Sequence, residues 1–246
     1  PLRGSLSGTS WGKGPEGSVE SKTDLRLTDL VLRGRELGDS SLQIETKSGR
    51  AKIEWSGLDG SAELKAFYDF TPGRDCFVEM KANGVDFTPM VLLLNPSLMQ
   101  DEGLVGRLSG SYRLDFASGQ AELGTGQARI SEYVLKKTGT TFRLDRPYDF
   151  RIERGSFSIP ALTLVGDEGS ATLSLRSTSG NLSGSIRGRL DLSLAEFLTS
   201  SVVKADGVSE MDLSIGGTLK APKLSGSGEV SGGSILIDGI ETPVEN

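Results

Sequence analysis

Apolar and polar residues alternate along most of this chain with a period of two residues. In residues 50–55, for example, Ala51, Ile53 and Trp55 alternate with charged residues. The same alternation recurs in residues 62–70, 76–82, 107–116, 148–153, 186–192 and 211–219. Successive side chains of a strand point to opposite faces, so this pattern predicts strands with one apolar face and one charged face. Phe67 is the exception within its segment, because it stands at a charged-face position.

Short turn signals separate these segments, such as Gly38-Asp39, Asp59-Gly60 and Ser179-Gly180. Glycine makes up 33 of the 246 residues, about twice its usual share, and beside alternating apolar segments it indicates turns. We expect roughly twenty strands, at about 8–12 residues for each strand and its turn. The sequence therefore predicts an all-β fold.

Two short helices are expected to interrupt the strands. Thr88 and Pro89 are typical of a helix start, and Asn95-Pro96 is typical of a helix end. Ser193 and Glu196 have the spacing of a capping box at the start of the second helix. We expect each helix to pack locally against the sheet.

A four-residue phrase occurs three times, about a hundred residues apart. The copies are Leu6-Ser7-Gly8-Thr9, Leu108-Ser109-Gly110-Ser111 and Ile215-Gly216-Gly217-Thr218. Val85-Asp86-Phe87 and Leu190-Asp191-Leu192 precede the second and third copies, each followed by a short apolar segment that ends at Gly103 or Gly207. A long period of this kind predicts a repetitive array. We expect three repeat units. The first is residues 1–110, the second is residues 111–217 and is continuous with the first, and residues 218–246 are the start of a third.

Composition removes several classes of function. The chain has no histidine, which excludes His-based general acid/base catalysis and Ser-His or Cys-His pairs. Its single cysteine, Cys76, cannot form an internal disulfide and is expected to pack as a small hydrophobic residue. The net charge of −6 argues against binding to nucleic acid.

Catalytic carboxylates are not expected. Asp101-Glu102 and Asp167-Glu168 are adjacent acidic pairs, but both stand beside glycine in turn-like contexts. Side chains in such turns are usually solvated, so a carboxylate mechanism like that of a polysaccharide-degrading enzyme is a minor alternative. We expect no enzyme activity, no cofactor and no metal site.

A sheet with one apolar face must cover that face, and it can do so as a closed barrel, a sandwich or an open trough. The long period and the low aromatic content of 6 % favour an elongated, curled, open trough with an apolar concave face. An apolar concave face of this kind suits lipid acyl chains, although the same side chains could form an ordinary hydrophobic core. The residues expected to line it are Leu64, Tyr68, Val78, Met80, Leu114, Phe116, Phe150, Ile152, Leu173, Leu175, Ile186, Leu190, Leu213 and Ile215.

The repeated phrases resemble those of the TamB/AsmA-like family of Gram-negative cell envelopes. In that family a hydrophobic-Asp-Leu phrase leads to a short helix, a Gly, two strands and a Gly-Thr-x-x-x-Pro-x-x-x-Gly element. The segment from Leu190-Asp191-Leu192 through Gly207 to Gly217-Thr218, Pro222 and Gly226 follows this pattern closely. The copy from Val85 has Ser111 in place of Thr and no proline before Gly124, and the opening copy lengthens the spacer to Pro15.

The resemblance implies a bridge-like lipid transporter. Members of the family are thought to hold phospholipid in an apolar β-channel across the periplasm, anchored in the inner membrane by an N-terminal helix, and to contribute to outer-membrane biogenesis. TamB itself pairs with an outer-membrane Omp85-type barrel. This chain lacks that anchor and a clear C-terminal partner strand, so it is expected to be an interior periplasmic segment, with the Omp85 partnership residing elsewhere.

A second hypothesis remains open beside lipid transport. The chain could be a structural or chaperone-like β-solenoid scaffold that binds outer-membrane β-barrel proteins through its edge strands. A filled, dry interior would favour the scaffold, whereas an open apolar lane would favour the lipid carrier.

Overall fold

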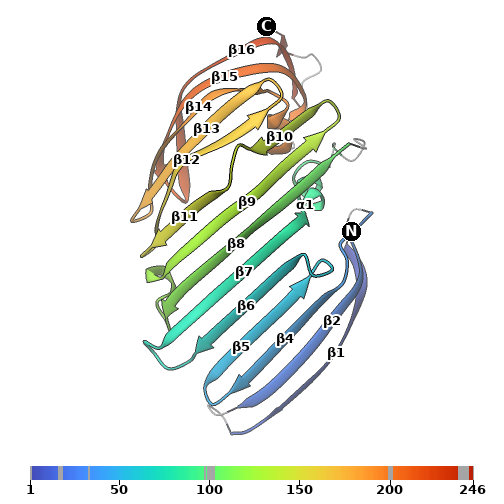
Figure 1. Ribbon diagram of the computed structural model, residues 1–246, viewed down its shortest axis with the longest axis vertical. Coiled ribbons are helices and arrows are strands. Elements are labelled where there is room, and N and C mark those ends of the chain that lie inside the picture. The colour runs from blue at the N-terminus through green and yellow to red at the C-terminus, as the bar shows by residue number, and fades with distance from the viewer. Residues whose placement is uncertain are drawn as a thin grey trace. The chain divides into compact units, whose positions relative to one another are not determined.

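The computed structural model describes residues 2–15, 19–32, 34–96, 98, 103–198, 202–237 and 244–245. They form an all-β protein, with one large antiparallel sheet and two short α-helices, as the alternation predicts (Figure 1). The strands are β1 (Leu2–Lys13), β2 (Glu20–Leu32), β3 (Arg35–Glu36), β4 (Ser40–Lys47), β5 (Arg50–Gly57), β6 (Ala62–Asp69), β7 (Asp75–Asp86), β8 (Val105–Ala117), β9 (Thr125–Lys137), β10 (Thr140–Leu144), β11 (Tyr148–Glu153), β12 (Ser156–Gly166), β13 (Gly169–Thr178), β14 (Asn181–Asp191), β15 (Val202–Thr218), β16 (Ala221–Ile237) and β17 (Val244–Glu245). The helices are α1 (Thr88–Leu94), α2 (Leu194–Leu198) and a 3-10 turn, η2 (Ala121–Leu123). Neither α-helix is long and apolar enough to cross a membrane.

Tight turns connect consecutive antiparallel strands. Ser48 and Gly49 join β4 to β5 with φ angles of 51° and 72°, and Ser179 and Gly180 join β13 to β14 with 50° and 79°. Two successive positive φ angles are typical of the turns that match the twist of a hairpin, and glycine adopts them without strain. The turn predicted at Ser179-Gly180 is therefore confirmed.

Glycine also has a second role that the sequence did not indicate. Gly8, Gly110 and Gly184 lie inside strands β1, β8 and β14, where a Cβ atom would come within 2.3–2.4 Å of a carbonyl oxygen of the neighbouring strand. A larger residue at these positions would force the strands apart. Two copies of the repeated phrase therefore lie within strands rather than at turns.

The described residues fall into two compact units, which are treated separately. Unit 1 comprises residues 1–85, 108–130 and 149–155, and unit 2 comprises residues 86–107, 131–148 and 156–246. In unit 1, β1 pairs with β2, and β2, β4, β5, β6 and β7 follow in antiparallel order. In unit 2, β12, β13, β14, β15 and β16 are paired in the same way.

Both helices lie in unit 2, where they cover a hydrophobic core as expected. Val91 and Leu92 of α1 and Phe197 of α2 pack with Phe142 and Leu190 of the sheet. Phe142 is completely buried, and its ring meets that of Phe197 edge to face at 6.0 Å. Cores of this kind supply most of the stability of short helices, whose own propensity is marginal.

The two helices begin in the same way, which supports the repeat. Asp86 Oδ1 accepts the amide of Thr88, and Asp191 Oδ1 accepts the amide of Ser193, each at 2.8 Å. The intervening amides, of Phe87 and Leu192, donate to the carbonyl oxygens of Gly106 and Gly207 at 2.9 and 2.8 Å. Gly106, and not the Gly103 expected from the sequence, is therefore the counterpart of Gly207.

The predicted start and end of α1 are confirmed, with proline in the first turn and Asn95 at the C-cap, but the predicted N-cap side chains are wrong. Phe87 occupies the N-cap position of α1, and the Thr88 hydroxyl instead accepts the amide of Gly106 at 2.7 Å. Ser193 and Glu196 do not form a capping box, because the Ser193 hydroxyl has no partner among the described residues. The Glu196 carboxylate instead faces the sheet, where other donors meet it.

Candidate functional site

The apolar side chains of unit 1 form continuous rows across its strands. Register pairs place Leu25, Leu42, Trp55, Leu64 and Met80 in one row, from β2 to β7. A second row, parallel to the first, contains Ile44, Ile53, Ala66 and Val78. Residues that face each other across antiparallel strands lie about 5 Å apart, so each row is a contiguous apolar strip.

The two rows together form the apolar strip of unit 1, and this strip is only half-buried. Among the described residues of unit 1, Cys76 is the one hydrophobic residue that is fully buried. Its burial confirms the packing expected for this cysteine, whose Sγ accepts the Asp69 amide at 3.4 Å. Leu64 and Val78 stay partly accessible, and Met80 is 45 % exposed. Neither described α-helix lies in unit 1, so the face has no α-helical cover of its own.

The other predicted groove residues of unit 1 share this partial exposure. Tyr68 contacts Phe116, with ring centroids 6.4 Å apart, and it meets Phe70 edge to face at 5.1 Å. These contacts bring the predicted residues of β6 and β8 together. The remaining residues of the prediction in this unit are also half-buried, and they are Leu114, Phe150 and Ile152.

In unit 2 the predicted residues form comparable rows. Leu173, Ile186 and Leu213 are register partners across β13, β14 and β15, and they are half-buried. Leu175 and Ile215 belong to a second row, which contains Gly184 between them. Strand β16 extends that row by Leu224, which is 64 % exposed.

Leu190 differs from the other predicted groove residues. It is 2 % exposed and belongs to the core beneath the helices, next to Ala171 and Phe197. A side chain so enclosed has no free surface for a ligand. The sequence could not reveal this, because Leu190 follows the same alternation as its exposed neighbours.

A buried polar cluster joins the helices of unit 2 to its sheet. Glu196 is 2 % exposed and accepts a 2.6 Å ion pair from Lys137 and a 2.8 Å hydrogen bond from the Ala205 amide. Asn95, at the end of α1, donates its side-chain amide to the Glu196 and Val202 carbonyl oxygens at 2.8 and 3.2 Å. Because a buried charge is tolerated only when paired and hydrogen-bonded, this cluster fixes α2 in place.

The opposite face of unit 1 carries charged pairs two residues apart on the same strand. Lys52 and Glu54 on β5, and Lys81 and Glu79 on β7, each lie 2.9 Å apart. The hydrogen bond from each lysine lowers the pKa of its glutamate, and the same bond raises the pKa of the lysine. On β8, Arg113 binds Asp115 at 2.7 Å, and this hydrogen bond raises the pKa of Arg113. Exposed pairs of this kind contribute little to stability individually, but they keep this face hydrated.

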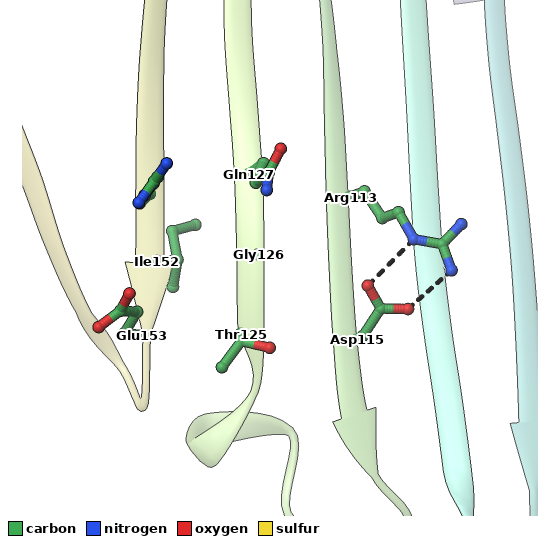
Figure 2. A pocket seen from close by; sticks show the side chains of 8 residues that line it. Arg113, Asp115, Thr125, Gly126, Gln127, Ile152 and Glu153 are labelled. Carbon is green, nitrogen blue, oxygen red and sulfur yellow. Dashed lines mark hydrogen bonds and ion pairs between the residues drawn. The ribbon is translucent and has the colours of Figure 1, made fainter.

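A cavity of about 500 Å³ lies on this charged face, and the sequence did not predict it. Figure 2 shows residues that line this cavity. Arg113 and Asp115 of β8 lie on one side of it, Thr125 and Gln127 of β9 in the middle, and Glu153 of β11 on the other side. The one available signal was Phe67, which lines an adjoining cavity and whose place among charged residues broke the alternation. Two adjoining cavities of about 540 and 280 Å³ also include Arg113.

One of the two acidic pairs considered for catalysis lies among the described residues. Asp167 and Glu168 are exposed in the turn between β12 and β13, where an Asp167 carboxylate oxygen accepts the Thr141 amide at 2.9 Å. Asp101-Glu102 lies outside the described residues. Within the part of the chain that the structure describes, no three cysteine, aspartate or glutamate side chains are grouped so that they could hold a metal ion.

A comparison of the chain with protein-family models, with curated proteins and with solved structures finds no match.

Proposed function

We propose that this chain is a segment of a bridge-like lipid carrier that holds phospholipid acyl chains along the apolar face of its sheet. In this proposal the sheet curls so that the apolar rows line a trough, while the charged face remains in water. The resemblance of the repeated phrases to the TamB/AsmA-like family extends the proposal to periplasmic transfer between the inner and outer membranes.

The observation that carries the proposal is the half-buried apolar strip of unit 1. Five register partners, from Leu25 to Met80, cross β2, β4, β5, β6 and β7 without interruption by a charged residue. Contiguous apolar patches above a few hundred Å² are uncommon on soluble monomers unless they bind something. Covering about 400 Å² with acyl chains would contribute roughly 10 kcal/mol by area, before the cost of ordering the lipid.

The length of the row suits an acyl chain. Five strands at a spacing of about 4.8 Å extend over roughly 19 Å. An acyl chain spans about half of the hydrocarbon core of a bilayer, or roughly 15 Å. A single row in unit 1 could therefore cover one chain along its length, and the second row could cover the other chain of the same phospholipid.

The test is native mass spectrometry of the full chain after expression in a Gram-negative periplasm, with lipid extraction from the same sample. We expect bound phospholipid in the parent chain. Ile44→Lys with Leu64→Lys places two charges in the apolar rows without making them register partners, and should lower the bound lipid about tenfold.

The matched control is Gln43→Lys with Ser56→Lys. It adds the same charge on the same and neighbouring strands, but at exposed positions of the charged face. Its lipid content should equal that of the parent. Far-ultraviolet circular dichroism confirms that both variants are folded. A lipid-free parent, or equal lipid in the two variants, would reject the proposal, and a lipid-free parent would favour the scaffold hypothesis.

A further inference from the structure

Two phenylalanines interrupt the charged face of unit 1. Phe67 of β6 and Phe77 of β7 are register partners, and their rings stack with centroids 6.2 Å apart. The guanidinium group of Arg113, on β8, lies 4.7 Å from the centroid of the Phe77 ring. On both strands, the residues two positions before and after each phenylalanine lie on the same face and are charged. The two rings therefore form an isolated apolar platform within a polar surface.

The platform opens into the polar cavities described above. Phe67 and Phe77 line the cavity of about 540 Å³, together with Leu123, which is 52 % exposed. Arg113 belongs to this cavity and to the neighbouring one of about 500 Å³, which β9 and β11 line. The aromatic platform and the polar groups therefore belong to adjoining cavities on the same face of unit 1.

The polar groups offer both hydrogen-bond donors and acceptors. Arg113 and Asp115 already bind each other, but Arg151 and Glu153 form no ion pair with any described residue. A guanidinium group can only donate, and a carboxylate can only accept. Gln127, which Figure 2 shows on β9 between Arg113 of β8 and Glu153 of β11, can do both.

The charges of the three cavities nearly cancel, which narrows the ligand class. Four cationic side chains face five anionic ones, and they are Lys81, Arg113, Arg129 and Arg151, and Asp75, Glu79, Asp115, Asp149 and Glu153. Neither a phosphate-rich ligand nor a polycation gains net attraction from such a balance. An uncharged ligand with many hydroxyl groups can instead bind donors and acceptors that lie outside the ion pairs, such as Arg151 and Glu153.

We propose that this face of unit 1 binds an uncharged oligosaccharide. The apolar C–H face of one sugar packs on Phe67 and beside Phe77, whose ring Arg113 covers, and hydroxyl groups of sugars further along the chain exchange hydrogen bonds with Gln127, Arg151 and Glu153. The site crosses β6, β7, β8, β9 and β11, neighbouring strands that span about 19 Å. It therefore takes a chain of several sugars rather than a monosaccharide, on the face opposite the proposed lipid strip.

The experiment is saturation-transfer difference NMR on the full chain with three uncharged probes, namely chitotetraose, cellotetraose and maltotetraose. We expect transfer to the C–H protons of at least one probe. Phe67→Ser with Phe77→Ser should weaken that binding about tenfold, because both ring contacts are lost. Arg151→Ala should weaken it severalfold through the loss of charge-assisted hydrogen bonds.

Matched controls lie elsewhere in the same unit. Trp11→Ser removes a ring that is 53 % exposed on β1, and Arg26→Ala removes an exposed arginine of β2. Both controls should bind the probe as the parent does, and so should Ile44→Lys with Leu64→Lys, whose changes lie on the lipid strip. The proposal is overturned if none of the three probes shows transfer, or if binding survives in both the double phenylalanine variant and Arg151→Ala.

Discussion

The two units solve the same problem of a one-sided apolar sheet in different ways. Unit 2 covers part of its apolar face with α1 and α2, and it gains a core in which Phe142 and Leu190 are almost completely buried. Unit 1 has no such cover, and its apolar rows stay half-exposed. The opposite face of its sheet carries paired charges. The alternation is nearly identical in both units, so the local pattern alone does not determine whether a face becomes a buried core or stays half-exposed.

Removal of a large ring should show the greatest difference between the units. Phe142→Ala should lower the free energy of unfolding by about 3–5 kcal/mol, because a fully buried ring leaves a cavity. Phe150→Ala, on the half-buried face of unit 1, should cost about 1–2 kcal/mol. Urea unfolding followed by circular dichroism measures both values, and Trp11 and Trp55, both in unit 1, report that unit separately by fluorescence. Equal costs would contradict the distinction between core and open face.

The buried ion pair of unit 2 should give the next largest effect. Glu196→Gln keeps an acceptor for the Ala205 amide but leaves Lys137 without its counter-charge. We expect a loss of about 2–3 kcal/mol in the free energy of unfolding. The control is Glu63→Gln, an exposed position of unit 1 that should change stability by less than about 0.5 kcal/mol. A cost for Glu196→Gln no larger than the control would mean that the pair does not fix α2.

Acid should weaken unit 1, with a smaller effect. The pKa values of Glu54 and Glu79 lie below the ordinary 4.5, chiefly because Lys52 and Lys81 hydrogen-bond to them, and that of Asp69 lies below 3.8, chiefly because of the Thr71 amide. Lowered folded pKa values mean that this stabilisation is complete above the ordinary values and is lost as the pH falls through the folded ones. Hydrogen-exchange protection, corrected for intrinsic rates, should therefore decrease in β5, β6 and β7 below about pH 4.5.

Two further measurements test this interpretation of the acid effect. High salt at neutral pH should reproduce part of the loss, because exposed pairs are screened. If β5, β6 and β7 kept their protection as the pH fell through this range, the carboxylates of Glu54, Asp69 and Glu79 would not stabilise unit 1.

The sequence determined the fold class and the residues of each face. Alternation around Ile53, for example, was sufficient for an all-β fold, because side chains of a strand alternate regardless of their tertiary setting. The turn at Ser179-Gly180 and the local packing of the helices were also predictable, since both depend on residues close in sequence. The N-cap side chains were not predictable, because the Thr88 hydroxyl and the Glu196 carboxylate bind partners at Gly106, Lys137 and Ala205, beyond the reach of a local motif.

Only the tertiary structure decided which apolar residues are covered and where polar groups converge. Leu190 and Leu213 have the same pattern in sequence, yet one is buried beneath Phe197 and the other is half-exposed. Arg113 and Arg151 lie on strands far apart in the chain, and strand pairing brings them to a single cavity. Burial and convergence depend on which elements pack over a face, and that is set by contacts between segments far apart in sequence, whereas the direction of each side chain is set by its own strand.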